Sequence, residues 1–393
     1  MKRSIFIIIG IIIVLILLAV WIYVLFFGNP KNLEEAFNRF GFGDTTDTTI
    51  IEEPIIEEEE NPVVDVNSEE KLRQLTTKPV IGYQEVRFST TSKPTIYFVE
   101  AGTGHIFSID LNSGEEKRVS GTTIPNSYNA AITPNGEYVI IQSGSGSSKK
   151  NTLGKIENGS LSSVVLNENI NNLKASLDNT FLYYSKTSFS SVGKEFFPIS
   201  NVYETLFTVP FRETTVVWGN TKGNSHYIYP KTAGRLEGFL YKSTNGTLTR
   251  TPVDGFGLSA IANDENIIFS KNNNGDYRSY VNKSDSINHL TSPINVLPEK
   301  CTFDRTIIYT AYCAQSVGEF NESYPDTWYA GEVTFADKIW KVNLNSLGAS
   351  ILIDTQRTTG RNLDIININN SGDGNNLYFQ NKLDNSLWLF ELN

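Results

Sequence analysis

Apolar and polar residues alternate along most of the chain from residue 71 to its end at residue 393. Short, strongly apolar segments recur there between polar turns, and the first five intervals between them are about 40–46 residues. The seven segments are 96–99 (IYFV), 138–141 (YVII), 181–184 (FLYY), 227–229 (YIY), 267–269 (IIF), 307–313 and 377–379 (LYF). Period-two strands repeated at this length are typical of four-stranded propeller blades. The pattern predicts an all-β domain over 71–393, a seven-bladed β-propeller, with six or eight blades left open because the unit at 201–253 is irregular.

Further strands follow the apolar segments with the same alternation. They are 105–111 (HIFSIDL), 338–344 (KIWKVNL) and 386–392 (SLWLFEL). Because one face of such a strand packs on the next blade, Trp340 and Trp388 are expected in the core between blades. Residues 72–80 resemble the outer strand expected at 287–294, yet they precede the first complete unit, and the last unit stops after its third strand. We therefore expect the N-terminal segment to complete the last blade, which leaves no unpaired sheet edge in the ring.

The sixth unit is longer than the others. Its apolar segment lies about 66–70 residues before the next one, which indicates an insertion of roughly 25 residues between Ala314 and Asp337. The insertion carries the candidate partner-binding residues Phe320, Tyr324, Asp326, Trp328, Tyr329 and Phe335. Long aromatic loops on a rigid scaffold often bind partners. The alternative, in which the rings fold back and cap one end of the propeller, is equally compatible with this composition.

The N-terminal region predicts a membrane anchor. Residues 4–27 are almost entirely apolar and contain no charge, which is long enough for one transmembrane helix. A cleaved signal would have a shorter apolar stretch and a small-x-small site, and neither is present. Lys2 and Arg3 lie in the stub at 1–3, so the positive-inside rule places this stub in the cytoplasm. The expected protein is a single-pass protein of the cell membrane, held in the lipid bilayer with its propeller outside the cytoplasm.

Residues 28–70 are expected to form a juxtamembrane segment and a disordered acidic linker. The stretch 44–70 holds eleven Asp and Glu residues and no Lys or Arg. The chain has a net charge of −10, so about +1 is left for the rest. The propeller is therefore close to neutral and lacks the basic surface that nucleic-acid binding requires.

The two cysteines predict a disulfide if the domain lies in an oxidising compartment. Cys301 and Cys313 flank a segment that can form a hairpin turning near residues 306–308, which sets the two side chains opposite each other. A turn at Asp304–Arg305 would instead place Cys301 opposite Ile308 and rule out the bond. Two cysteines and three scattered histidines offer no zinc-ligand spacing, and we expect no metal or cofactor.

Several segments resemble a known fold family. The segments ITPNGEYVII (132–141), ASLDNTFLYYS (175–185) and NNSGDGNNLYF (369–379) resemble the strand–turn–strand signature of TolB-like and WD-repeat-like propellers. The stretch YPDTWYAGEVTFADKIWKVN (324–343), together with the two cysteine motifs, resembles an uncharacterised family of membrane-anchored propellers from candidate-phyla bacteria. That resemblance implies a location in the cell envelope and no assigned activity.

The sequence contains no recognisable catalytic motif. A G-x-S-x-G nucleophile motif is absent, and His105, His226 and His289 fall in different units. We therefore expect no enzyme and no catalytic residues, but an interaction module that holds an envelope protein or polysaccharide. The alternative is an envelope hydrolase or lyase that acts on a glycan through carboxylates in the central channel.

Overall fold

The computed structural model describes residues 71–392, except for 88–93, 158, 221–222, 274, 284–285 and 319–322. The chain separates into two compact units, Met1–Glu60 and Asn61–Asn393, and the description concerns the second. The predicted stub, the transmembrane helix at 4–27 and the linker at 28–70 lie outside the described residues. Across the described part of the chain, no helix is long and apolar enough to span a membrane.

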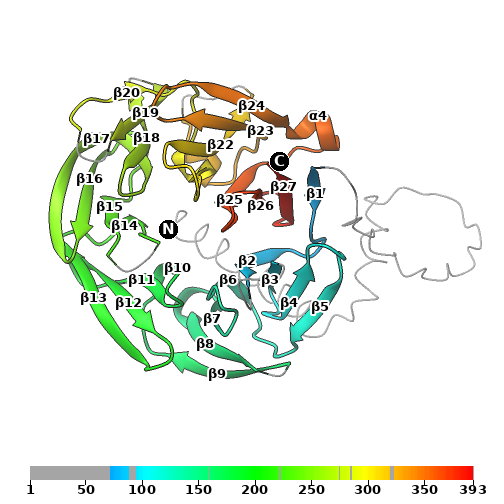
Figure 1. Cartoon of the computed structure of the whole chain (residues 1–393). Helices are drawn as coiled ribbons and strands as arrows, with labels where there is room; N and C mark the ends of the chain where they lie inside the picture. Colours follow the sequence, from blue (N-terminus) through cyan, green and yellow to red (C-terminus); the bar gives the residue numbers. More distant parts are fainter. Residues whose placement is uncertain are drawn as a thin grey trace, which may run out of the picture. The chain divides into compact units, whose positions relative to one another are not determined.

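The described region is built of antiparallel sheets that follow one another around a ring (Figure 1). Three sheets of four consecutive strands come first: β2 (Val80–Val86), β3 (Thr95–Glu100), β4 (Ile106–Asp110) and β5 (Glu116–Ser120); β6 (Ser127–Ile132), β7 (Tyr138–Ser143), β8 (Lys150–Glu157) and β9 (Ser160–Leu166); β10 (Asn171–Ala175), β11 (Phe181–Lys186), β12 (Ser191–Phe197) and β13 (Val202–Val209). In each sheet the first strand lies innermost, because the first strands of successive sheets contact one another around the axis.

A seven-stranded sheet comes next. It consists of β14 (Thr214–Val217), β15 (His226–Pro230), β16 (Glu237–Thr244), β17 (Thr247–Ala262), β18 (Asn266–Asn273), β19 (Asp276–Lys283) and β20 (Leu290–Thr291). Its central strand β17 pairs with β16 through residues 247–256 and with β18 through residues 256–262. This double pairing explains the irregular spacing of the unit at 201–253, because one long strand replaces two separate ones.

Two more four-stranded sheets complete the ring. The first holds β21 (Cys301–Phe303), β22 (Thr310–Val317), β23 (Ala336–Asn343) and β24 (Ala349–Asp354). The second holds β25 (Ile365–Asn370), β26 (Asn376–Asn381), β27 (Leu387–Glu391) and, from the other end of the domain, β1 (Leu72–Gln74). Short helices lie at Gly146–Ser148 (η1), Pro298–Lys300 (η2), Asp326–Tyr329 (α3) and Thr355–Thr359 (α4).

Strand β1 closes the ring as the sequence predicts. Leu72 pairs with Phe390 and Gln74 with Trp388, so the start of the domain is hydrogen-bonded to its end. Leu72 is 2% exposed and lies in one core cluster with Trp388 and Phe390. The predicted segment at 72–80 is longer than the strand, since the chain leaves the sheet after Gln74 and Val80 already starts β2.

The predicted apolar segments are the second strands β3, β7, β11, β15, β18, β22 and β26. They are apolar on both faces because each is covered by the neighbouring sheets on either side. Trp388 is buried as expected, whereas Trp340 is half-buried at the edge of its cluster. The turns that precede three of these strands place Gly136, Asn179 and Gly374 at positive φ, which explains the Asn- and Gly-rich motifs there.

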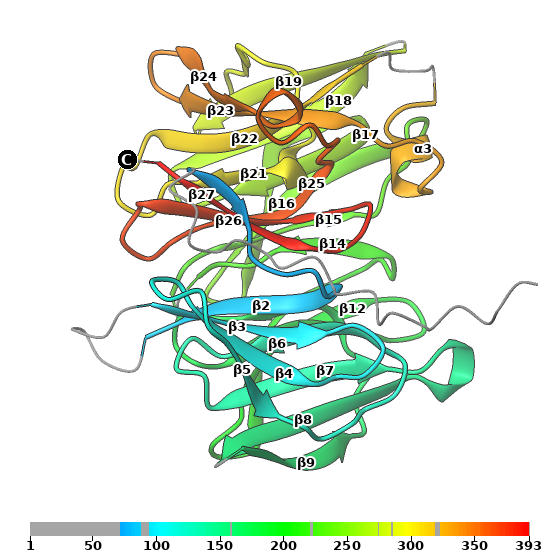
Figure 2. The same ribbon diagram turned by 90° about the vertical axis from the view of Figure 1, so that its right-hand side faces the viewer.

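The insertion in the sixth unit is shorter than predicted. Strand β22 continues to Val317 and β23 begins at Ala336, so residues 314–317 and 336–337 belong to strands. The insertion proper, residues 318–335, was overestimated because its polar and small flanking residues hide the strand pattern. Figure 2 shows its helix α3 on one side of the ring, with the C terminus on the opposite side.

Candidate functional site

The innermost strands enclose a cavity of about 720 Å³ at the centre of the ring, which we call the channel. It is lined by β2, β6, β10, β14 and β25, by the second half of β17, and by residues on either side of β21. Amide side chains are common in this lining: Gln84, Asn129, Asn172, Asn220, Asn367 and Asn369. A volume of about 300–1,000 Å³ is usual for small-molecule sites. The channel is therefore the principal candidate site of the described region.

Two of these amides, which lie in the sheets on either side of the β2–β5 sheet, are fixed in the same way. Asn129 donates from Nδ2 to Oε1 of Gln142 at 2.7 Å, and Asn367 donates to Gln380 at 2.7 Å. Each glutamine in turn donates to a backbone carbonyl of a neighbouring sheet, Ile170 or Val80. The side-chain oxygens of Asn129 and Asn367 form no hydrogen bond with any described residue, so both can accept one from a ligand.

The open mouth is the end of the channel at which the innermost strands have their C-terminal ends. Ion pairs lie beside it. The Arg87 guanidinium lies 2.7 Å from Glu85 and 3.1 Å from Asp373, and the hydrogen bond with Glu85 raises the pKa of Arg87. Burial opposes the ionisation of Asp373, but hydrogen bonds from Ser371, the Asn375 N–H and Arg87 lower its pKa. One arginine therefore holds both carboxylates.

Two other cations of the channel have no such partner. Lys174, on β10, donates to the Asn220 side chain at 3.0 Å, and the Arg305 backbone N–H donates to Asn370 at 3.0 Å. Within the described residues, neither side chain forms an ion pair. Burial and then the charge of Arg305 lower the pKa of Lys174 to about 8. The two cations thus repel each other across a partly desolvated space.

The described part of the insertion lies over the other end of the channel. Tyr329 donates to both carboxylate oxygens of the channel-lining Glu299, at 2.7 and 2.6 Å, and burial raises the pKa of Glu299. Asp326 accepts from the Gly234 N–H in the β15–β16 turn, at 3.0 Å to each oxygen. Lys382, in the β26–β27 turn, donates to the Trp328 carbonyl. The insertion is therefore fastened to three sheets at this end.

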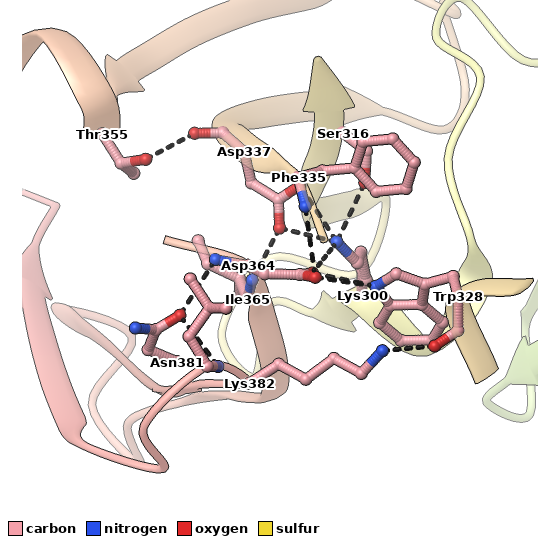
Figure 3. A network of polar contacts seen from close by, with 11 residues as sticks. Lys300, Ser316, Trp328, Phe335, Asp337, Thr355, Asp364, Ile365, Asn381 and Lys382 are labelled. Atoms are coloured by element: carbon pink, nitrogen blue, oxygen red, sulfur yellow. Dashed lines mark hydrogen bonds and ion pairs between the residues drawn. The ribbon is translucent and has the colours of Figure 1, made fainter. Parts of the chain in front are cut away.

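A buried ionic cluster anchors the insertion (Figure 3). The Lys300 ammonium contacts Asp337 at 2.7 Å and Asp364 at 2.6 Å, and all three side chains are fully buried. Asp364 also accepts from Nε1 of Trp328 at 3.0 and 2.9 Å, through its two oxygens, and from the Phe335 N–H at 3.3 Å. The cluster joins η2, β23 and the start of β25 to the insertion, so it fixes α3 against the ring.

The predicted partner-binding residues divide into two groups. Tyr324, Trp328 and Phe335 are 9%, 5% and 8% exposed and form a core cluster with Leu297. For these three rings the structure favours the capping alternative, because their faces are covered by the propeller. Tyr329 is 46% exposed and the partly exposed Asp326 is bonded to Gly234, while Phe320 lies outside the described residues.

The two cysteines pair as opposite residues of β21 and β22. Cys301 lies across from Cys313, and their sulfur atoms are 2.10 Å apart. The chain turns between Asp304 and Thr310, whose backbones are hydrogen-bonded, and not at Asp304–Arg305. This turn also places Arg305 at the channel.

The three histidines have separate local contacts. His105 lies beside Arg118 and Thr123, and His289 packs edge-on against Phe269. His226 accepts from the Gly219 N–H, and burial lowers its pKa to about 4. Over the described residues, no group of three or more His, Cys, Asp or Glu side chains could hold a metal ion.

The described fold is similar to solved β-propellers. Two structures of oligogalacturonate lyase, one from Vibrio parahaemolyticus and one in complex with manganese, are 8% and 9% identical to this chain, with TM-scores of 0.52 and 0.53. Each comparison covers 82% of this chain and 93% of the lyase. TolB from Acinetobacter baumannii is 12% identical over 68% of this chain and 61% of TolB, with a TM-score of 0.39. The sequence matches no protein-family model and no curated protein.

Identities this low show the fold alone. The two lyase structures confirm the predicted all-β propeller at the level of fold. The resemblance to a membrane-anchored family of candidate-phyla bacteria stays a prediction.

Proposed function

We propose that this chain is a membrane-anchored, extracytoplasmic β-propeller that acts as a binding module in the cell envelope and takes up a protein or glycan partner at the open mouth of its channel. We further propose seven blades, because β17 serves as the outermost strand of one blade and the innermost strand of the next. The proposal differs from the sequence-based expectation in the surface that binds, which is the channel instead of the aromatic insertion.

The observation that carries the proposal is the asymmetry of the channel. At one end, Tyr329 and Asp326 fasten the insertion over the cavity. At the other end, the lining reaches the exposed Leu177 and the turns that hold Asn135 and Asn220. A cavity of about 720 Å³ with many amide side chains, bordered by the insertion at one end only, suits the capture of a projecting group of a larger partner.

Binding is favoured over catalysis because of the state of the carboxylates. Glu85 and Asp373 at the open mouth are both paired with Arg87, so neither is free to act as a general acid. Glu299 has a raised pKa, but it is bonded to Tyr329 beneath the insertion. A pair of free carboxylates flanking one accessible point, as glycan hydrolysis requires, is not formed by these three residues.

The envelope location is supported by the sequence and by the cysteines. Residues 4–27 have the length and composition of a membrane span, and positive charge precedes them. The Cys301–Cys313 bond is of the kind that persists in oxidising compartments. An alkaline phosphatase fusion at the C terminus should therefore be active in cells, and a cytoplasmic reporter fusion there should be inactive.

The binding surface is tested by crosslinking in cells, followed by affinity purification and mass spectrometry. Leu177→Trp places a bulky ring at the open mouth, because Leu177 lines the channel and is 41% exposed. Ile199→Trp is the matched control, since Ile199 is 80% exposed in the β12–β13 turn of the same sheet and does not line the channel. We expect Leu177→Trp to lose specific partners that the native chain and the control both capture.

Two results would count against the proposal. If Leu177→Trp and Ile199→Trp capture the same partners as the native chain, binding does not use the open mouth. If no variant captures a partner but the purified chain cleaves an envelope glycan, the hydrolase or lyase alternative replaces the binding module.

A further inference from the structure

Lys174 and Arg305 are two cations of the described channel lining that form no ion pair. They come from β10 and from the turn after β21, which lie in different sheets, yet both line the same cavity. At the open mouth, Glu85 and Asp373 pair with Arg87, and the charge of Glu85 also favours the ionised form of Arg305. Two like charges in a space partly closed to water interact more strongly than they would in bulk water. An anion between them would relieve this repulsion.

The surroundings of the two cations restrict the kind of anion. A guanidinium offers a planar pair of donors that fits a carboxylate or a phosphate, and an ammonium adds a point charge. Around them, side-chain oxygens of Asn129, Asn367 and Asn369 have no hydrogen-bond donor in the described structure. Unused acceptors next to cations suit a ligand that carries both an acidic group and hydroxyl groups.

We propose that the channel is a binding site for an acidic sugar, with its carboxylate or phosphate between Lys174 and Arg305 and its hydroxyl groups on the channel amides. The inference rests on the proposed function and names the chemistry of the group that the module takes up. A cavity of about 720 Å³ can hold a sugar unit at the end or side of a longer chain.

The test is calorimetric titration of the full chain, purified in a mild detergent, with four probes. Glucuronic acid carries the carboxylate, glucose 6-phosphate carries the phosphate, glucose carries only hydroxyl groups and inorganic phosphate carries only charge. We expect one or both acidic sugars to bind at least about tenfold more tightly than glucose and inorganic phosphate, and the tighter one identifies the acidic group. Binding should weaken as salt is raised.

Variants then locate the site. Lys174→Gln and Arg305→Gln should each weaken binding of the acidic sugar by about tenfold or more, as expected for the loss of one charge-assisted hydrogen bond. Lys117→Gln is the matched control, because Lys117 lies on the outermost strand β5, is paired with Glu115 and is far from the channel lining. Circular dichroism and thermal melting establish that all three variants remain folded.

Each remaining outcome overturns the inference. Binding of neither acidic sugar, equal binding of glucose, or unchanged binding by Lys174→Gln and Arg305→Gln would each refute it. The partner-capture experiment in cells distinguishes a failure of the acidic-sugar inference from a failure of the proposed binding function. If Leu177→Trp blocks capture but the acidic sugars do not bind, the module binds at the open mouth and only the acidic-sugar inference fails.

Discussion

The buried ionic cluster makes a strong prediction about stability. Replacing Lys300 by Met keeps an unbranched side chain one atom shorter but removes the ammonium that contacts both Asp337 and Asp364. Lys300 also donates to Ser316 at 2.9 Å, so three residues lose a charge-assisted donor. At about 1.5 kcal/mol each, these bonds give about 4–5 kcal/mol. This agrees with the about 3–5 kcal/mol that the loss of one partner of a buried pair costs.

The loss should depend on pH in a defined direction. Burial already raises the pKa of Asp337 in spite of Lys300. A carboxyl with a raised folded pKa favours folding most below its unfolded value of about 3.9, and this contribution is lost as pH rises through the folded value. Without Lys300 the pKa of Asp337 should be higher still, because the Lys300 charge and hydrogen bond lower it. The penalty of Lys300→Met should therefore be largest near pH 8 and decrease toward pH 5.

Urea unfolding followed by tryptophan fluorescence measures this penalty in the full chain. The matched control is Lys338→Met, on the same strand as Asp337, whose ion pair with Asp354 at 3.0 Å is about a third exposed. Such surface pairs contribute about 0–1 kcal/mol. A loss for Lys300→Met no larger than that of the control, or a penalty that grows on acidification, would refute the cluster as the anchor of the insertion.

Three further changes test other parts of the fold. Leu72→Ala should lower the free energy of unfolding by about 2–5 kcal/mol in urea titrations, because Leu72 is 2% exposed where β1 closes the ring; a loss below about 1 kcal/mol would refute that role. Alkylation before reduction should label neither cysteine, and prompt labelling of the native chain would contradict this. Replacing both Cys301 and Cys313 by Ala should lower the free energy of unfolding by about 2–3 kcal/mol, as expected for a disulfide that closes a loop of twelve residues. Burial lowers the pKa of His226 to about 4, so its neutral form favours folding above about pH 6.5 and this contribution is lost as pH falls toward 4. The variant His226→Gln should therefore lose about 2–3 kcal/mol less stability on acidification than the native chain. An unchanged dependence of stability on pH would refute the assignment.

Much of the fold follows from periodicity in the sequence. The second strands stand out because neighbouring sheets cover both of their faces, which requires a continuous apolar run such as FLYY at residues 181–184. Ring closure was predictable because an outer strand was present at one end of the domain and missing at the other. The shared strand β17 was not, because its segment PVDGFG (252–257) has the composition of a turn between two separate strands, whereas the structure pairs the whole segment as one strand.

The channel could not be predicted in the same way. Lys174 and Arg305 are 131 positions apart in sequence, and nothing local indicates that the ring brings them into one cavity. The sequence signal for the channel was a charged residue in or next to the first strand of a unit. Such a charged residue is usually interpreted as solvent-exposed and so does not indicate a cavity. The sequence could not place the rings of the insertion, because buried and partner-binding rings have the same composition. The structure buries Tyr324, Trp328 and Phe335, while Tyr329 is 46% exposed and partner binding by the insertion stays a prediction.

The point where the predicted linker joins the propeller leads to a last prediction. The Glu391 N–H donates to the Lys71 carbonyl and the Leu392 N–H to that of Asn375, each at 2.8 Å. Asn375 is in the turn that contains Asp373, so Lys71, the first described residue, lies on the side of the open mouth.

We therefore expect partner capture in cells to depend on linker length. An extended chain covers about 3.3–3.6 Å per residue, so deleting residues 44–65 shortens the reach of the tether by up to about 70–80 Å. The deletion should reduce crosslinking to envelope partners, whereas binding of an acidic sugar to the purified chain should not change. Replacing residues 44–65 by a Gly/Ser sequence of the same length should preserve capture, because the length of the linker and not its charge determines how far the tether extends. Loss of capture in the Gly/Ser variant would show instead that the acidic linker itself takes part in binding, and full capture by the deletion variant would show that the open mouth needs no clearance from the membrane.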